Sequence, residues 1–376
     1  MPLAMPPAMS AAATRFHPLR VTEVRRETPD AVSVALRPPP GADFAFAPGQ
    51  YLTFRRSADG EELRRSYSIC SGLDDGELRV GIKRVPGGRF SGWANAELRP
   101  GDVLEAMPPE GRFGLTPDPA APPRTVLGVA AGSGITPILS VAASLLAREP
   151  RSRVVLLYGN RGAEEVMFRG ALEDLKDRHL ARLSVVHVLS REKHELAALH
   201  GRLDAARIAA LLRGLVAPGA LSDALLCGPA GLSEAATEAL TAFGLDPARI
   251  RVERFAGGSP ATARAPAPPV APSVVPPVVP QGAVVATAEI TADGVTRAVP
   301  MAEGETILEA GLRAGLDLPW SCRGGMCCTC RARLTAGEAA MALNYSLQPW
   351  EMAAGFVLTC QSRPRGPHVA VDYDAA

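Results

Sequence analysis

The 376-residue sequence has few aromatic side chains and no surplus of either charge. Aromatic residues make up 5% of the chain, and 40 basic residues nearly cancel 39 acidic ones, so the formal net charge is +1. Nonspecific binding to nucleic acid or to an anionic membrane needs a strong positive field. We therefore expect no nucleic acid and no membrane as partners.

The chain also lacks a convincing membrane segment. Residues 125–147 carry no charge and are long enough to cross a bilayer. However, Gly132-Ser133-Gly134 and Thr136-Pro137 interrupt this run, which favours a buried strand, a turn and a helix. Residues 1–14 have no basic cluster and contain prolines, which predicts a disordered tail instead of a signal peptide. We expect a cytoplasmic protein.

Proline, by contrast, is abundant, and its excess is local. The chain has 35 prolines, and residues 265–282 read APAPPVAPSVVPPVVPQG. This run predicts an extended polyproline II spacer, and an SH3-type ligand is the less favoured alternative. The predicted parts of the chain are a tail (1–14), a first domain (15–119), a second domain (120–257), a linker (258–283) and a third domain (284–376).

The three predicted domains differ in the periodicity of their apolar residues. The first contains short β-rich runs separated by Pro-Gly and Gly-Asp turns, which predict a small antiparallel barrel. The second alternates apolar strands with helix-patterned segments, which predicts a parallel α/β sheet. The third begins with a hairpin around Asp293-Gly294, followed by a helix from Thr306, where Glu309 completes a capping box. The fold class is therefore multidomain, β and α/β.

Four of the seven cysteines follow a specific spacing. Cys322-x4-Cys327-x2-Cys330, followed much later by Cys360, matches the ligand pattern of plant-type [2Fe-2S] centres. A structural zinc site is the alternative, although zinc sites usually pair two close C-x2-C motifs. Cys328 lies between two of these residues, where its side chain points in another direction, so we interpret it as a small buried thiol and not as a ligand.

The surroundings of these cysteines support a cluster loop. Gly324 and Gly325 allow positive φ and a close approach of backbone N–H groups to sulfur. Residues 284–376 resemble a plant-type [2Fe-2S] ferredoxin domain with a β-grasp fold. The resemblance implies four metal ligands: Cys322, Cys327, Cys330 and Cys360.

Three arginines stand beside these ligands in the sequence: Arg323, Arg331 and Arg333. Because an electron must leave near the cluster, they could form a basic rim that steers an acidic partner. An equally weighted alternative is that these arginines are solvated or donate hydrogen bonds to carbonyl groups of their own domain.

The first domain carries a motif for a flat cofactor with phosphates. Arg65 and Tyr67 lie on one face of a predicted strand, and residues 87–91 include two glycines that open a short helix, a natural pyrophosphate site. This set resembles the flavin domain of the ferredoxin–NADP reductase superfamily. The resemblance implies FAD, with its phosphate on Arg65, its ring against Tyr67 and its N5 near Ser68. It also implies further flavin-lining positions: Ile82, Lys83, Gly88, Ser91 and Phe255.

The second domain carries a nucleotide motif at the end of its first strand. Residues 132–137, Gly-Ser-Gly-Ile-Thr-Pro, open a helix, where Thr136 could cap and Pro137 suits the first turn. Free N–H groups there can hold a phosphate. The segment departs from G-x-G-x-x-G and resembles the nicotinamide domain of the same superfamily. The resemblance implies nucleotide-binding positions at Gly132, Ser133, Gly134, Thr136, Pro137, Cys227, Gly228 and Pro229, with Cys227 near the reacting nicotinamide carbon.

Charge at the next two strand ends favours NADPH over NADH. NAD sites usually place an acidic residue after the second strand, whereas NADP sites place a cation. Here those strands end in Asn160-Arg161 and Ser190-Arg191, and hydroxyl and guanidinium groups suit a 2′-phosphate. Glu164 and Glu165 lie close enough to keep NADH as the less favoured alternative.

These segments together predict an electron-transfer chain from NADPH through FAD to a [2Fe-2S] cluster, without a catalytic carboxylate pair or triad. Residues 324–330, 341–351 and 355–361 closely resemble the reductase subunits of phenylacetyl-CoA epoxidases, which are multicomponent di-iron oxygenases. The implied partner is the oxygenase component of such a system. Reductases of Rieske-type oxygenases are the alternative, and a redox sensor or binding module without turnover is an alternative of another class.

Overall fold

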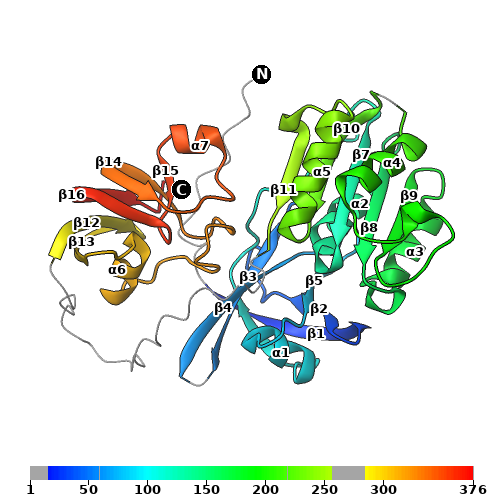
Figure 1. Cartoon of the computed structure of the whole chain (residues 1–376). Helices are drawn as coiled ribbons and strands as arrows, with labels where there is room; N and C mark the ends of the chain where they lie inside the picture. Colours follow the sequence, from blue (N-terminus) through cyan, green and yellow to red (C-terminus); the bar gives the residue numbers. More distant parts are fainter. Residues whose placement is uncertain (1–15, 59, 218, 256–283, 376) are drawn as a thin grey trace. The chain divides into compact units, whose positions relative to one another are not determined.

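The computed structural model describes residues 16–58, 60–217, 219–255 and 284–375. Within these ranges the chain forms two compact units. One contains Phe16, the 53–66 segment and the C-terminal residues, and the other contains residues 17–52 and 67–255. Figure 1 shows the elements of both units. The predicted tail (1–14) and linker (258–283) lie outside the described residues.

The antiparallel sheet predicted for the first domain is confirmed. Its strand order is β4-β3-β6-β1-β2-β5, and β1 pairs antiparallel with both β2 and β6. A short helix follows β5 and begins after Gly88, as the glycine pair predicted. The elements are β1 (His17–Thr28), β2 (Ala31–Arg37), β3 (Tyr51–Ala58), β4 (Glu61–Ser68), β5 (Leu78–Lys83), α1 (Arg89–Ala96) and β6 (Val103–Ala106).

The second domain contains the predicted parallel sheet, in the order β11-β10-β7-β8-β9. Its elements are β7 (Thr125–Ala131), η2 (Gly132–Gly134), α2 (Ile135–Arg148), β8 (Arg153–Asn160), η3 (Ala163–Glu165), α3 (Arg169–Arg178), β9 (Leu183–Leu189), η4 (Ala197–Leu199), α4 (Ala205–Leu215), β10 (Leu221–Cys227), α5 (Ala230–Ala242), η5 (Pro247–Arg249) and β11 (Ile250–Glu253). The sequence did not predict the edge strand β11, which is too short to show a periodic pattern.

Alternating residues of these strands face opposite layers of helices. Val126, Val154 and Leu156 belong to one core with α2 and α3. Leu127 and Val155 belong to a second core with α4 and α5. Since side chains alternate along a strand, the near-continuous apolar runs of β7 and β8 are explained by burial on both faces.

The parallel sheet and the antiparallel barrel share one of these cores. Four barrel residues pack into the core that contains α2: Ala31, Cys70, Phe113 and Leu115. The Ser140 hydroxyl of α2 also donates to the Ser71 carbonyl at 2.7 Å. These two domains are therefore built around common buried side chains within one unit.

The third domain has its own sheet and its own core. The strand order is β13-β12-β16-β14-β15, with β12 parallel to β16, and its core is formed by side chains of this domain. The predicted capping box at Thr306 and Glu309 is present, and Gly315 has a φ of 78° after the helix. The elements are β12 (Val284–Ala292), β13 (Val295–Ala302), α6 (Ile307–Arg313), β14 (Arg331–Met341), α7 (Pro349–Ala353), β15 (Phe356–Leu358) and β16 (Ser362–Asp372).

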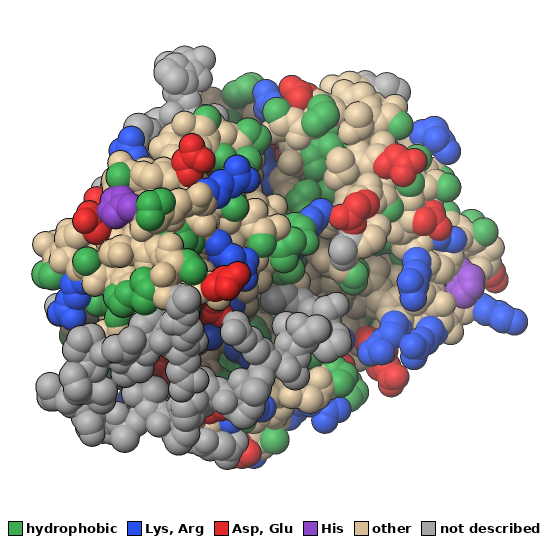
Figure 2. Space-filling model, turned by 60° about the vertical axis from the view of Figure 1, so that its left-hand side comes forward, with side chains coloured by type: hydrophobic (Ala, Val, Ile, Leu, Met, Phe, Trp, Pro, Cys, Tyr) green, Lys and Arg blue, Asp and Glu red, His purple; other side chains and the backbone are tan. Residues whose placement is uncertain are grey.

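The described surface agrees with the small net charge. On the face drawn in Figure 2, acidic and basic side chains are interspersed among hydrophobic and polar ones. Among the described residues, no helix combines the length and the apolar character needed to cross a membrane.

Candidate functional site

The cysteine loop connects α6 to β14 and wraps back on its own sulfur atoms. The backbone N–H groups of Gly324 and Met326 donate to Cys322 Sγ at 3.3 and 3.4 Å. The N–H of Cys322 points to Cys327 Sγ at 3.5 Å. Such N–H···S contacts stabilise thiolates, and thiolates are the form that binds iron.

The four predicted ligands form two thiol pairs. A hydrogen bond from the Cys327 thiol lowers the pKa of Cys322, and a hydrogen bond from the Cys330 thiol lowers the pKa of Cys360. The donor of each pair correspondingly has a raised pKa. Among the described residues, no three His, Cys, Asp or Glu side chains converge on one metal position. Three cysteines on one loop with a distant fourth have the spacing of a two-iron centre, in which each iron takes two thiolates.

The residues of the cysteine loop that have a positive φ are not all the ones expected from the sequence. Gly325 has the expected positive φ of 74°, but Gly324 does not. The other left-handed positions are Arg323 and Cys328, at 49° and 58°. Cys328 is partly buried and packs against the core of the domain, in line with its interpretation as a thiol apart from the four.

The predicted basic rim is wrong for Arg331. Its guanidinium is buried, donates to Glu351 Oε1 at 2.6 Å and lies 4.5 Å from the ring centre of Phe356. The Arg323 guanidinium lies 3.9 Å from the ring centre of Trp320. Arg331, the first residue of β14, cannot belong to such a rim because it points into the domain and meets a buried carboxylate, whereas Arg323 and Arg333 are exposed.

The predicted flavin residues lie on β4, β5 and α1. The ring of Tyr67 lies 5.6 Å from that of Phe90, at an interplanar angle of 34°. Ser68 and Ile82 are buried, whereas Arg65 is exposed. The amine of Lys83 lies 3.3 Å from Asp30 and 3.7 Å from Glu165.

The turn before α1 is closed by Ser91. Its hydroxyl accepts a hydrogen bond from the N–H of Val85 at 3.1 Å. A Cβ on Gly88 would lie 2.5 Å from this same hydroxyl oxygen. The two predicted positions therefore depend on each other, and only glycine fits at 88.

Close backbone packing explains the glycines at the ends of β7 and β10. A Cβ on Gly134 would lie 2.1 Å from the carbonyl oxygen of Cys227, and one on Gly228 would lie 2.7 Å from Leu232. Residues 132–137 and 227–229 therefore meet at the carboxyl edge of the parallel sheet, where nucleotides bind in open α/β folds. Cys227 is buried, and burial raises the pKa of its thiol.

Thr136 does not cap the helix as predicted. A single 3-10 turn, η2, precedes α2, which begins at Ile135 after Gly134. The Thr136 hydroxyl donates instead to the Ser133 carbonyl at 3.0 Å. Because α2 begins at Ile135, Thr136 lies in the first turn of the helix and not at its cap position.

The ends of β8 and β9 lie side by side, as required for one nucleotide site. The N–H of Ser190 donates to the Asn160 carbonyl at 2.9 Å, and that of Arg191 donates to the Arg161 carbonyl at 2.8 Å. The Arg161 side chain pairs with Glu165, its Nε lying 2.6 Å from the carboxylate. The side-chain amide nitrogen of Asn160 is buried at this edge, within reach of the Tyr158 hydroxyl. An amide donor at the joined ends of two parallel strands suits a nucleotide, so this edge fits a dinucleotide.

Sequence reasoning missed Glu253, the last residue of β11. It pairs in register with Cys227, and desolvation raises the pKa of its carboxyl group to about 8. The four residues of β11, Ile-Arg-Val-Glu, are too short and too mixed to show a strand pattern, so the sequence carried no signal for this carboxylate. Phe255 follows and packs against the core shared by the barrel and α2.

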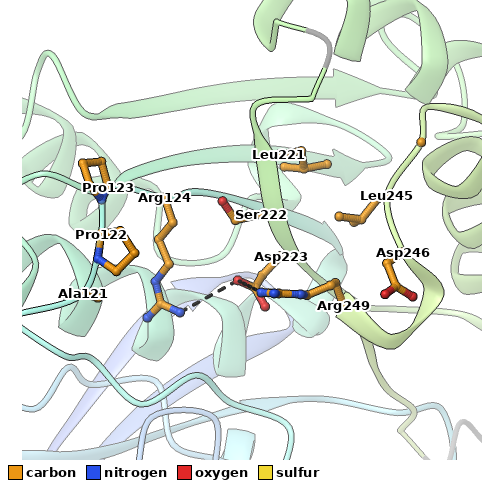
Figure 3. Close-up of a pocket in the computed structure, with 11 residues that line it drawn as sticks. Ala121, Pro122, Pro123, Arg124, Leu221, Ser222, Asp223, Leu245, Asp246 and Arg249 are labelled. Carbon is orange, nitrogen blue, oxygen red and sulfur yellow. Dashed lines mark ion pairs between the residues drawn. The ribbon is translucent and has the colours of Figure 1, made fainter. Parts of the chain in front are cut away.

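A further pocket lies at the opposite edge of the parallel sheet. Its volume is about 550 Å³, and Arg124, Asp223 and Arg249 stand at its floor. Figure 3 shows the guanidinium of Arg124 directed at the buried carboxylate of Asp223, at 3.8 Å. Because it lies at the amino ends of β7 and β10, this pocket is separate from the nucleotide edge.

Comparisons with known sequence families agree with this division into sites. The oxidoreductase FAD-binding domain matches residues 18–114, the oxidoreductase NAD-binding domain matches 129–238, and the 2Fe-2S iron-sulfur cluster binding domain matches 290–365. The fold and the sites define a modular electron-transfer oxidoreductase, and the chain belongs to the family of reductases that join these three domains.

The relatives are parts of oxygenase systems. The chain is 42% identical to one of the subunits of the 1,2-phenylacetyl-CoA epoxidase of Escherichia coli, over 96% of this chain and 99% of that protein. It is 35% identical to the 3-ketosteroid-9-alpha-monooxygenase ferredoxin reductase component of Mycolicibacterium smegmatis, over 95% and 96%. Phthalate dioxygenase reductase has the same fold, with a TM-score of 0.58, 23% identity and coverage of 97% and 100%.

Proposed function

We propose that this protein passes electrons from NADPH, through FAD and a [2Fe-2S] cluster, to the di-iron oxygenase component of a phenylacetyl-CoA epoxidase. The identity of 42% to one protein of such an enzyme, over nearly the whole of both chains, supports this choice of partner. The cysteine loop, in which backbone N–H groups point at Cys322 Sγ within a segment that matches a 2Fe-2S cluster binding domain, is the observation that carries the proposal. We place the protein in the cytoplasm, since all seven cysteines are free thiols and thiols persist in reducing compartments.

We assign the two thiol pairs to the two irons of the cluster. Cys322 and Cys327 would hold one iron, and Cys330 and Cys360 would hold the other. The N–H groups that already point at Cys322 Sγ favour its thiolate form before any metal binds. Cys328 takes no part in ligation.

The barrel residues hold and orient the flavin. Arg65 would bind an FAD phosphate, since its guanidinium is exposed on β4. The Tyr67 ring, tilted against Phe90, offers a preset aromatic face for the isoalloxazine. Ser68 would place its hydroxyl near flavin N5, and Ser91 holds the glycine turn that receives the pyrophosphate.

The nicotinamide domain brings its nucleotide to the flavin. When bound, FAD takes a hydride from the nicotinamide and gives up electrons singly, a chemistry that belongs to the cofactors. Gly134 packs directly on the Cys227 carbonyl, and these two residues would stand beside the nicotinamide at the carboxyl edge of the sheet. The buried thiol of Cys227, whose pKa is raised, stays protonated and packs as a small neutral group.

We infer a preference for NADPH from the partners of two arginines. Arg161 is engaged with Glu165, whereas Arg191 is exposed beside Ser190 at the neighbouring strand end. An exposed guanidinium and a hydroxyl suit the 2′-phosphate. The buried amide donor of Asn160 would serve the same nucleotide.

Reconstitution tests the function. The purified reductase, NADPH and the di-iron component should support epoxidation of phenylacetyl-CoA, with flavin and iron–sulfur bands bleached by NADPH. A colourless protein, or one that NADPH does not bleach, would overturn electron transfer and favour a binding module or sensor.

A Rieske-type oxygenase is the second candidate partner. The 35% identity to the 3-ketosteroid-9-alpha-monooxygenase ferredoxin reductase component supports it. A pull-down from cells grown on phenylacetate should recover the di-iron component. Recovery of a Rieske-type oxygenase instead would favour this second candidate.

A further inference from the structure

The ferredoxin domain exposes an uncharged, apolar surface next to its cysteine loop. Four large side chains make up this 342–354 surface: Leu343, Tyr345, Trp350 and Met352, with exposed fractions of 45%, 43%, 47% and 44%. Residues 342–354 contain one charged side chain, Glu351, which is buried. Exposed apolar groups that cluster, instead of occurring singly, mark interaction sites.

These side chains are held in one place by the fold. The Asn344 amide oxygen accepts from the N–H groups of Ser346 and Leu347, at 3.1 and 2.8 Å. Its amide nitrogen donates to the Leu347 carbonyl at 3.0 Å and lies 3.3 Å from the sulfur of Met352. Asn344 therefore joins the 343–345 segment to Met352 of α7, the helix that also carries Trp350.

The same surface is attached to the cysteine loop. Gly325, which lies between Cys322 and Cys327, accepts through its carbonyl from the Tyr345 N–H at 3.0 Å and from the Ser346 hydroxyl at 3.1 Å. A Cβ on Gly325 would lie 2.8 Å from the Leu343 carbonyl. A molecule bound to the 342–354 surface would therefore lie next to the cysteine loop, where the cluster would pass on its electron.

The buried ion pair fixes the other end of the surface. Glu351 accepts from Arg331 at 2.6 Å and from the Gln348 N–H at 3.0 Å, which ties α7 to β14. A surface that is already rigid loses little conformational entropy when a partner binds.

We propose that the 342–354 surface is the docking site for the oxygenase component that receives electrons from the cluster. The occupant presents a matching uncharged, apolar face, because a charged residue placed there would be desolvated without a counter-ion. Aromatic and Met side chains are enriched in interface cores, and Trp and Tyr often dominate their energetics. A second copy of this chain is the less suitable occupant, since it would cover the electron exit.

This docking proposal rests on the proposed function. It places the docking site on apolar side chains, whereas the basic rim considered from the sequence would dock through exposed arginines. Docking through apolar contacts depends weakly on ionic strength, whereas steering by exposed charges is screened by salt.

The test uses the full-length, cofactor-loaded reductase with two variants, Trp350→Ser and Leu343→Glu. Turnover of the di-iron component should fall about 10- to 100-fold at limiting oxygenase concentration, by a similar factor at low and high salt. Reduction of ferricyanide by NADPH and the visible spectrum should stay at wild-type level, because a small acceptor needs no docking face. Val295→Ser is the matched control, as Val295 is 53% exposed on β13 of the same domain and should lose nothing.

Three results would overturn the proposal. Unchanged oxygenase turnover in both variants would mean that the partner docks elsewhere, with the proposed function intact. A wild-type dimer that dissociates on Leu343→Glu would identify the surface as a contact between copies. Wild-type protein that reduces ferricyanide but supports no oxygenase turnover would overturn the proposed function, and the docking proposal with it.

Discussion

The guanidinium of Arg331 donates to Glu351 Oε1 at 2.6 Å, and both side chains are buried in the ferredoxin domain. The pair joins the first residue of β14 to α7 across twenty residues of sequence. Buried ion pairs are costly to break from one side, because the remaining charge is left without compensation.

Removing only one member of this pair should destabilise the ferredoxin domain. We expect Arg331→Leu to cost about 3–5 kcal/mol, and the double variant Arg331→Leu, Glu351→Leu to recover much of it. Thermal unfolding followed through the visible cluster absorbance measures both. A single variant as stable as the wild type would show that the pair contributes little.

The four predicted ligands should each be essential for the cluster. Serine at Cys322, Cys327, Cys330 or Cys360 should abolish the iron–sulfur bands and leave FAD bound, because the four cysteines lie in the third domain, whose core is formed by its own side chains. The control, Cys328→Ser, should keep the bands. A clusterless Cys328→Ser protein beside a normal Cys327→Ser protein would shift the ligand assignment by one residue.

The nucleotide preference should depend on Arg191. Arg191→Ala should lose about 1.5–3 kcal/mol of NADPH binding, or roughly 10- to 150-fold in kcat/KM, with little change for NADH. Arg161→Ala is the matched control, since Arg161 is already paired with Glu165, and its loss should be smaller. Equal losses for both nucleotides in Arg191→Ala would remove this residue as the phosphate contact.

Much of this organisation could be predicted from the sequence because it depends on local patterns. Alternating apolar residues located the strands, and the spacing of four cysteines located the metal loop. The pairing of Arg331 with Glu351 could not be predicted, because it depends on the tertiary placement of α7 against β14. Thr136 was interpreted as a cap because Thr followed by Pro137 suits a helix start, whereas α2 begins at Ile135, directly after the 3-10 turn of Gly132–Gly134.

Glu253 should make stability depend on pH. Desolvation raises the pKa of this carboxyl group from 4.5 to about 8, so between these values the folded protein holds a proton that the unfolded chain releases. The free energy of unfolding should therefore fall as pH rises, by at most about 1.4 kcal/mol per pH unit.

Urea unfolding between about pH 5 and pH 8 measures this slope. Glu253→Gln should flatten it. The control, Glu238→Gln, changes an exposed residue of α5 and should leave it unchanged. A slope that survives in Glu253→Gln would assign the pH dependence to another group.

The contact between Gly134 and Cys227 should not tolerate a side chain. Gly134→Ala would place a methyl group 2.1 Å from the Cys227 carbonyl oxygen, and the forced shift should cost about 1–3 kcal/mol. Gly170→Ala is the control, because a methyl group in α3 would meet nothing within 4 Å. Urea midpoints of the two FAD-loaded variants provide the comparison, and equal midpoints would contradict the close approach.

The core that α2 shares with the barrel limits where related reductases can recombine. A crossover near residue 120 would give Phe113 and Leu115 a foreign helix to pack against, and mismatched volumes there would leave cavities or clashes. A crossover after residue 255 would leave that core and the separate core of the third domain each inherited whole. Over evolution, the FAD-binding and nicotinamide-binding domains should therefore be inherited together.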